Sequence, residues 1–325
     1  MRLIDSREQI FRQSCTMRTL LAFIITLSFF PFAFANDEIP IPGIGPVSIK
    51  KLATSGGFTE GPASLLDGSV VFSDMNQEKV YHVDLEGNLS VFIDKVRRTN
   101  GLFVDLKGQL FACETRKGDA AVVRFDLETK ERTVVAGSYQ GKPFNRVNDL
   151  VIDREGGIYF SDIMKGGPEL PQPDSGVYYV SRDGEVTKLI ENMKAPNGVL
   201  LSRDETSLFV AAMGEQRVAR YPILEPGKVG EGRTFYEFDP GKDVRHGGDG
   251  MAIDVNGNFY FAQFRGQSVH VVNPHGELLG IIPFETNTTN CAFGGKDGRT
   301  LYVTSGGSIY ALRMEVPGHR FPGRL

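Results

Sequence analysis

The chain has 325 residues, of which 41% are hydrophobic, so it is long enough for one large core or two ordinary domains. Its formal net charge is -4 and it contains no basic tract, which argues against nucleic acid or an anionic membrane surface as a partner. Its 38 glycines are scattered between short apolar runs, a distribution typical of many tight turns rather than of disorder.

The first 35 residues have the features of a secretory signal. After Met17 and Arg18 comes the apolar run "TLLAFIITLSFFPFAFA", which ends in small residues at Ala33 and Ala35. This pattern predicts cleavage after Ala35 and export of the mature protein to the periplasm or beyond, with no remaining membrane segment. Met17 is better placed than Met1 as the translation start. The alternative, an uncleaved anchor, is less favoured because a membrane helix needs about 20 apolar residues.

Removal of the signal also removes Cys15 and leaves two cysteines, Cys113 and Cys291, inside the apolar runs "LFACE" and "NCAF". Two cysteines do not make a disulfide framework for a chain of this length. We therefore expect both to be buried and to pack as small hydrophobic residues.

From residue 51 onward, short β-rich runs alternate with turn signals such as "LDGS", "REGG" and "VNGN", and no long stretch has a helical period. This pattern predicts an all-β protein. We expect an N-terminal lead-in over residues 36–50, one repeat domain over 51–316 and a C-terminal tail over 317–325.

A repeated unit runs through this domain. Each unit begins with a polar residue at the head of an apolar run, and these residues are Glu60, Asn100, Asn148, Asn197, Asp249 and Asn290. The steps between them are 40, 48, 49, 52 and 41 residues. Fourteen residues after each lies a second position, occupied by Asp74, Glu114, Asp162, Ala211, Gln263 and Thr304. The fourth unit, with its alanine, departs from the otherwise polar pattern.

Repeats of 40–50 residues with several strands each are typical of a β-propeller, here with six blades. Two β-sandwiches would also supply many strands, but would not place a polar residue at the head of every unit. The innermost strand of a blade lines the central channel, so the six first positions should form a ring at one mouth. The second strand runs back, so the residue fourteen positions later should return to the same face. The run "VSIKKLAT" could complete the last blade and close the ring.

The first ring offers two carboxylates, Glu60 and Asp249, and four amides. An all-oxygen ligand set suits a hard cation, and Ca²⁺ better than Mg²⁺ or Zn²⁺. Without a cation, two converging buried carboxylates would repel each other. For Asn100 and Asn290 we favour a simpler role in which the side chain caps a strand.

The motifs "FTEGP", "NRVNDLVID", "APNGV", "GDGMAID" and "NCAFGGKDGRTLYVTS" resemble the SMP-30/gluconolactonase/regucalcin family over about residues 55–313. The resemblance implies a six-bladed propeller with an axial divalent metal, most often calcium, that hydrolyses sugar lactones and related esters. It assigns metal binding to Glu60, Asn197 and Asp249, with Asn148 as a further ligand or a water-mediated partner. It assigns substrate binding to Arg146, and to Asn148 as well. A substrate-binding acidic residue of some relatives has no direct match; only Glu169 is near.

We therefore expect metal-assisted lactone hydrolysis, with the metal as Lewis acid and Asp249 as both ligand and general base. Arg146 would hold substrate hydroxyls, a substrate carboxylate or the developing oxyanion. Asp74, Glu114 and Asp162 are candidates for the rim of the site, although hydrogen bonding to strand-end backbone is the simpler role for each. His246, three residues before Asp249, is a further candidate, with solvation in a loop as the simpler explanation.

Two alternatives stay open. An arylesterase or phosphotriesterase could use the same calcium site, and an exported sugar-binding or protein-interaction propeller could hold a purely structural calcium. No G-x-S-x-G, H-E-x-x-H, C-x-x-C or P-loop motif points to other chemistry.

Overall fold

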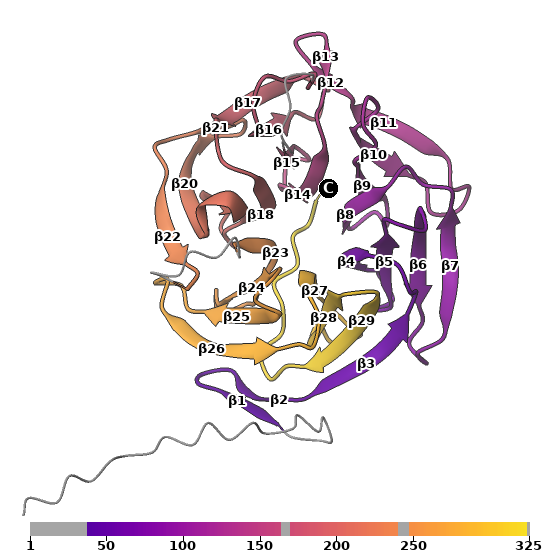
Figure 1. Ribbon diagram of the computed structural model, residues 1–325, viewed down its shortest axis with the longest axis vertical. Coiled ribbons are helices and arrows are strands. Elements are labelled where there is room, and N and C mark those ends of the chain that lie inside the picture. The colour runs from indigo at the N-terminus through magenta and orange to yellow at the C-terminus, as the bar shows by residue number, and fades with distance from the viewer. Residues whose placement is uncertain (1–37, 164–169, 240–246, 324–325) are drawn as a thin grey trace, which may run out of the picture. The chain divides into compact units, whose positions relative to one another are not determined.

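The computed structural model describes residues 38–163, 170–239 and 247–323. Six small antiparallel sheets stand around a common axis in the order of the chain (Figure 1), which confirms the expected six-bladed β-propeller. The expected signal segment, Glu169 and His246 lie outside the described residues. Within the described ranges, no helix has the length and apolar character needed to cross a membrane.

Each blade has an inner strand, two middle strands and an outer strand. The first blade contains β4 (Thr59–Ser64), β5 (Val70–Asp74), β6 (Lys79–Val83) and β7 (Leu89–Asp94). The second contains β8 (Thr99–Val104), β9 (Leu110–Glu114), β10 (Ala121–Phe125) and β11 (Arg132–Ala136). The third contains β14 (Val147–Ile152), β15 (Ile158–Asp162), β16 (Gly176–Val180) and β17 (Val186–Glu191).

The fourth blade contains β18 (Pro196–Leu201), β19 (Ser207–Ala212), β20 (Arg217–Glu225) and β22 (Arg233–Glu237), with the short β21 (Lys228–Val229) beside β20. The fifth contains β23 (Gly248–Ile253), β24 (Phe259–Gln263), β25 (Ser268–Val272) and β26 (Leu278–Pro283). The sixth contains β27 (Thr288–Gly294), β28 (Thr300–Ser305), β29 (Ser308–Arg313) and β3 (Ile49–Thr54). A 3-10 turn, η1 (Met213–Glu215), follows β19.

Strand β3 closes the ring. It pairs antiparallel with β29, and the register runs from Ser308↔Thr54 to Leu312↔Ile49. The expected pairing of the run "VSIKKLAT" with the last blade is therefore confirmed. Because strands from the two ends of the domain share one sheet, opening the ring requires breaking a ladder of backbone hydrogen bonds.

Neighbouring blades pack through apolar side chains that alternate along the middle strands. Phe72, Phe111, Phe160 and Phe261 are all fully buried, one in each of four blades. Cys113 and Cys291 are buried and unoxidised, as expected for small core residues. The core therefore lies between the sheets, and the space around the axis is left to the inner strands.

The lead-in and the tail both pack on the propeller. A hairpin of β1 (Ile39–Ile41) and β2 (Gly45–Val47) buries Ile41, Ile44 and Val47 against residues of the fifth and sixth blades. A two-stranded ribbon of β12 (Ser138–Tyr139) and β13 (Lys142–Pro143) joins the second blade to the third.

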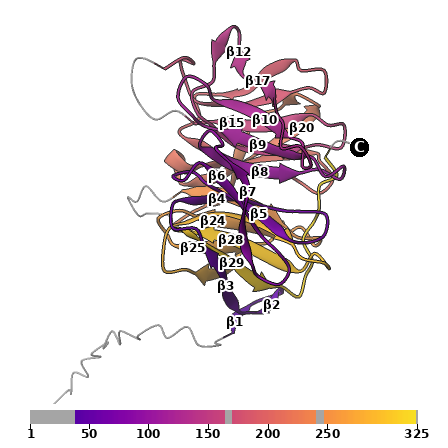
Figure 2. The same cartoon turned by 90° about the vertical axis from the view of Figure 1, so that its right-hand side faces the viewer.

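The C-terminal segment crosses one mouth of the channel. Gly318 and His319 donate backbone hydrogen bonds to the carbonyls of Gly298 and Ile253, in the sixth and fifth blades. Pro322 accepts one from Leu106 of the second blade. Figure 1 shows this yellow segment running across the middle of the ring, and Figure 2, with the ring edge-on, shows it on one face. Its hydrogen-bond partners follow the carboxyl ends of the inner strands, so it covers the mouth opposite the polar ring.

Candidate active site

The six first polar positions lie in one closed ring of inner strands. In five blades the pairing of the inner strand with its neighbour is interrupted by a β-bulge at this position, between Glu60 and Ala63, Thr99 and Leu102, Val147 and Leu150, Pro196 and Val199, and Gly248 and Met251. In the sixth blade the irregularity lies between Thr288 and Asn290. A bulge turns side chains away from the regular alternation and is frequent beside active sites.

Adjacent inner strands approach each other very closely at these bulges, and this explains the glycines that follow the polar residues. A Cβ on Gly61 would lie 2.3 Å from the carbonyl oxygen of Asn100. A Cβ on Gly198 would lie 2.2 Å from the carbonyl oxygen of Asp249. The sixth and first blades are joined where Thr289 Oγ1 donates to the carbonyl of Thr59, at 2.8 Å. The chain therefore needs glycine where it brings these strands together.

The expected metal and base residues are deeply buried in this ring. Glu60 and Asp249 are each 3% exposed, Asn197 is 4% exposed and Asn148 is 9% exposed. Glu60 comes from the first blade, and Asn197 and Asp249 come from the adjacent fourth and fifth blades. Carboxylates are almost never this buried unless they are paired or bind a cation.

The residues present fit a hard cation. Besides the two carboxylates, Asn100 holds its Oδ1 buried without a hydrogen-bond partner among the described residues. The described part of the chain has no cluster of three or more His, Cys, Asp or Glu side chains placed to hold a metal. A ligand set here would consequently combine carboxylate and amide oxygens, which is the donor chemistry of Ca²⁺ rather than of Zn²⁺.

Asp149 is a buried carboxylate of the ring that the sequence reasoning missed. Its side chain accepts hydrogen bonds from the backbone of Leu150 and Val199 and from the side chain of Asn290, and so links the third, fourth and sixth blades. Burial raises the pKa of Asp149 to about 7, against the lowering effect of these hydrogen bonds. The signal was present in the sequence: aspartate follows Asn148, whereas the first polar residue of each of the other five units is followed by glycine or cysteine.

The second set of positions returns to the same end of each blade, as expected. Asp74 faces Thr59, Glu114 faces Thr99, and Asp162 faces Val147 in the strand register. Asp74 accepts from the backbone N–H groups of Gly57 and Phe58, and Glu114 forms an ion pair with Arg132 at 2.6 Å. These carboxylates accept hydrogen bonds from the backbone of the segments that lead into the inner strands.

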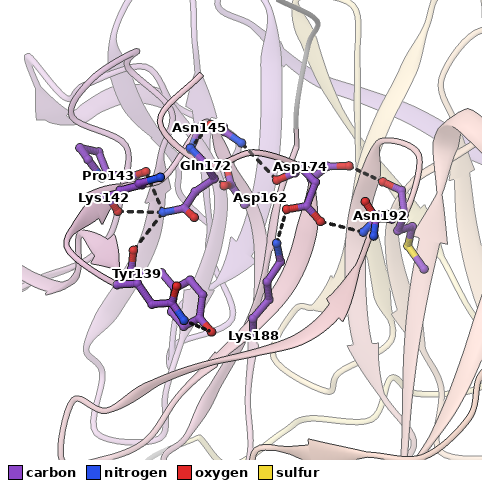
Figure 3. A network of polar contacts seen from close by, with 12 residues as sticks. Tyr139, Lys142, Pro143, Asn145, Asp162, Gln172, Asp174, Lys188 and Asn192 are labelled. Atoms are coloured by element: carbon purple, nitrogen blue, oxygen red, sulfur yellow. Dashed lines mark hydrogen bonds and ion pairs between the residues drawn. The ribbon is translucent and has the colours of Figure 1, made fainter. Parts of the chain in front are cut away.

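Arg146 lies directly before β14 on a firmly anchored segment. Asp162 accepts hydrogen bonds from the backbone of Asn145 and Arg146, at 3.0 and 2.6 Å, and burial raises the pKa of its carboxyl to about 6. Figure 3 shows that Asn145 in turn accepts from the backbone of Gln172. The Gln172 amide donates to the carbonyls of Tyr139, Lys142 and Pro143. The backbone of Arg146 is thus fixed, and its half-buried guanidinium donates to Thr115 Oγ1 at 3.3 Å.

The channel continues beneath the ring as a cavity of about 340 Å³. Asp149 and Asn290 line it at the level of the ring, and His319 and Phe321 of the C-terminal segment line its opposite end. The C-terminal segment therefore forms part of the wall of this cavity, at the end away from the polar ring.

The model of the family described as "SMP-30/Gluconolactonase/LRE-like region" matches residues 58–307, the whole of the ring of inner strands. The chain belongs to this family. A gluconolactonase from Zymomonas mobilis is 28% identical over 299 residues, covering 83% of this chain and 82% of its own length. A 6-deoxy-6-sulfogluconolactonase from Pseudomonas putida is 29% identical over 196 residues, covering 55% of this chain and 65% of its own.

Solved structures of the family have the same architecture. A gluconolactonase from Xanthomonas campestris superposes with a TM-score of 0.74 at 26% identity, covering 86% of this chain and 98% of its own. The calcium-binding protein regucalcin from Agrobacterium tumefaciens superposes with a TM-score of 0.73 at 22% identity, covering 88% and 99%. This second likeness concerns the fold.

Proposed function

We propose that the protein is a divalent-metal-dependent hydrolase that opens sugar lactones, with Asp249 as the general base. The coarser statement, that it is a lactone-hydrolysing enzyme, rests on its family and on relatives named gluconolactonase and lactonase. The observation that carries the finer one is the burial of two carboxylates, Glu60 and Asp249, among six first positions whose other four residues are asparagines. Such a ring can hold a hard cation and still present a base to substrate.

In this proposal Glu60, Asn148, Asn197 and Asp249 hold the metal. When bound, Ca²⁺ would act as a Lewis acid that polarises the lactone carbonyl. The Asp249 carboxylate takes a proton from water as the water oxygen attacks the carbonyl carbon. The C–O bond of the lactone ring then breaks, and the proton returns from Asp249 to the departing lactone oxygen, which leaves an open-chain hydroxy acid. Arg146 orients substrate from its anchored position beside β14.

The sharpest test compares two variants that each remove one charge from the same ring. Asp249→Asn and Glu60→Gln should both weaken calcium binding. At saturating calcium, Glu60→Gln should recover most activity, whereas Asp249→Asn should lose about 10²–10⁴-fold in kcat, because a base acts in the transition state. Calcium binding measured by calorimetry on both variants gives a readout besides turnover. Near wild-type kcat for calcium-loaded Asp249→Asn would restrict Asp249 to a ligand role.

A substrate panel tests the reaction class. Aldonolactones should be turned over, and turnover should stop in EDTA and return with added calcium. Preferential hydrolysis of aryl or phosphate esters would instead indicate an esterase on the same site. Binding of calcium without turnover of any ester would support the alternative of a non-enzymatic binding propeller with a structural calcium.

We also propose that the protein is exported after cleavage of its signal. N-terminal sequencing of exported material should begin at Asn36. Material that retains Phe23 or Ile24 would point to an anchor.

A further inference from the structure

Two arginines occupy the same position in adjacent blades at the mouth of the site. Arg98 lies two residues before Asn100 of the second blade, and Arg146 lies two residues before Asn148 of the third. At this position the other blades carry Phe58, Ala195, Gly247 and Thr288. The backbone equivalence is direct: the carbonyl of Arg98 accepts from Thr115, and that of Arg146 accepts from Ile163, each just after the second strand of its blade.

The two arginines lie near each other, on either side of Thr115. Both arginines are half-buried, and both contact Thr115, through the carbonyl of Arg98 and through Nε of Arg146. Burial lowers the pKa of Arg146, and the positive charge of Arg98 lowers it further. Arg98 also adopts φ = 52°, in the left-handed region that favours glycine, as does Ala195 at the same position of the fourth blade. The chain thus holds two like charges near each other.

Neither charge is neutralised within the described residues, where no carboxylate forms an ion pair with Arg98 or Arg146. Neighbouring arginines of the same region are paired: Arg116 with Glu78 at 2.7 Å, Arg132 with Glu114 at 2.6 Å, and Arg97 with Asp119. A pair of half-buried guanidiniums with no protein anion is suited to bind an anion from solution, because each presents several N–H donors in fixed directions.

We propose that Arg98 and Arg146 form an anion clamp that selects lactones carrying a negatively charged group, such as a carboxylate, phosphate or sulfonate. The proposal rests on the lactonase function proposed above and names the substrate class of the same site. The lactone carbonyl would face the carboxylate ring while the charged group at the far end of the sugar meets the two guanidiniums. Arg98 is a specificity residue in this scheme, since it contacts the charged group and not the reacting bond.

A pair of substrates that differ only in the far group tests the clamp. The 1,4-lactone of D-gluconate ends in a hydroxymethyl group, and the 1,4-lactone of D-glucarate ends in a carboxylate. We expect kcat/KM to favour the glucarate lactone, and the preference to weaken as ionic strength rises. In Arg98→Gln the ratio of the two kcat/KM values should fall about tenfold or more, the effect of losing one charge-assisted hydrogen bond. Arg98→Lys should keep part of the ratio, because the charge remains but the fork geometry is lost.

Matched controls separate the clamp from general electrostatics and from misfolding. Arg116→Gln removes the same charge one residue after Thr115, from a guanidinium that already has a carboxylate partner, and should leave the ratio unchanged. Arg98→Gly removes the same side chain but tolerates the positive φ, so it should fold at least as well as Arg98→Gln and show the same loss.

Binding measurements distinguish failure of the clamp from failure of the lactonase proposal. Calorimetry should show that wild-type protein binds D-glucarate more tightly than D-gluconate, and that Arg98→Gln removes the difference. If neither lactone is hydrolysed but this binding difference is found, the lactonase proposal fails and the anion site stands. Equal kcat/KM values for both lactones, unchanged in Arg98→Gln, would overturn the clamp.

Discussion

Gly250 lies against Asn290 so closely that a Cβ on the glycine would fall 1.9 Å from the amide carbon of the asparagine. The two residues belong to the inner strands of the fifth and sixth blades, and Gly250 directly follows Asp249. Asn290 also donates to the buried carboxylate of Asp149. The close packing of Gly250 against Asn290 therefore couples the position of the proposed base, Asp249, to the hydrogen bond between Asn290 and Asp149.

Gly250→Ala should displace Asn290 and with it Asp249. We expect a loss of about 1–3 kcal/mol in the free energy of unfolding, the usual cost of overpacking, and a larger relative loss of kcat. Denaturant melts and initial rates measure the two effects. Gly137→Ala is the control, because a Cβ there would meet only Val134, at an ordinary 3.4 Å. Equal free energies of unfolding and equal kcat values for the two variants would show that the inner strands tolerate displacement of Asn290 and Asp249.

Removal of the proposed metal should destabilise the fold, because Glu60 and Asp249, as its proposed ligands, would join distant blades through it. A ligand present at 100 times its dissociation constant stabilises the folded state by about 2.7 kcal/mol. The melting temperature should fall in EDTA and recover with added calcium, and the shift should shrink in Glu60→Gln. An unchanged melt after confirmed metal removal would count against an axial site.

The C-terminal segment should contribute to stability through Phe321, which is 7% exposed and packs in the core cluster of the third, fourth and fifth blades. Phe321→Ala should lower the free energy of unfolding by about 3 kcal/mol, the low end for a buried phenylalanine. The neighbouring Arg320 is exposed, so Arg320→Ala should change stability little. Similar melts for both variants would mean that the tail is not docked in solution.

His270 should make stability depend on pH. Burial lowers its pKa from 6.5 to about 4, and its Nδ1 lies 2.7 Å from the hydroxyl of Tyr236. Between pH 4 and pH 6.5, the imidazole of His270 is protonated in the unfolded chain but neutral in the folded chain. Stability is therefore complete above pH 6.5 and is lost as the pH falls toward 4, by about 3 kcal/mol in total.

The check is the pH dependence of unfolding in His270→Gln compared with wild type. The variant should lose less stability between pH 6.5 and 4, because one group no longer titrates. His275→Gln, which removes an exposed histidine of the same blade, should keep the wild-type slope. Parallel curves for wild type and His270→Gln would contradict a buried neutral imidazole.

The number of blades, the ring of first positions and the return of the second set were readable from the sequence. Each depends on a local pattern that recurs at a nearly fixed offset, and the offset of fourteen residues is set by two short strands and one turn. The burial of Cys113 and Cys291 was readable for the same reason, since apolar neighbours within one strand predict a core position.

Contacts between residues of different blades were decided only by the tertiary structure. The place of Asp149, held by Val199 and Asn290, depends on strands that are far apart in the chain and meet only when the ring closes. The proximity of Arg98 and Arg146, and the path of the tail over the opposite mouth, arise in the same way. Repeat spacing determines which end of a blade a residue occupies, whereas the distance between two blades is determined by packing, and packing here depends on single glycines that let the inner strands touch.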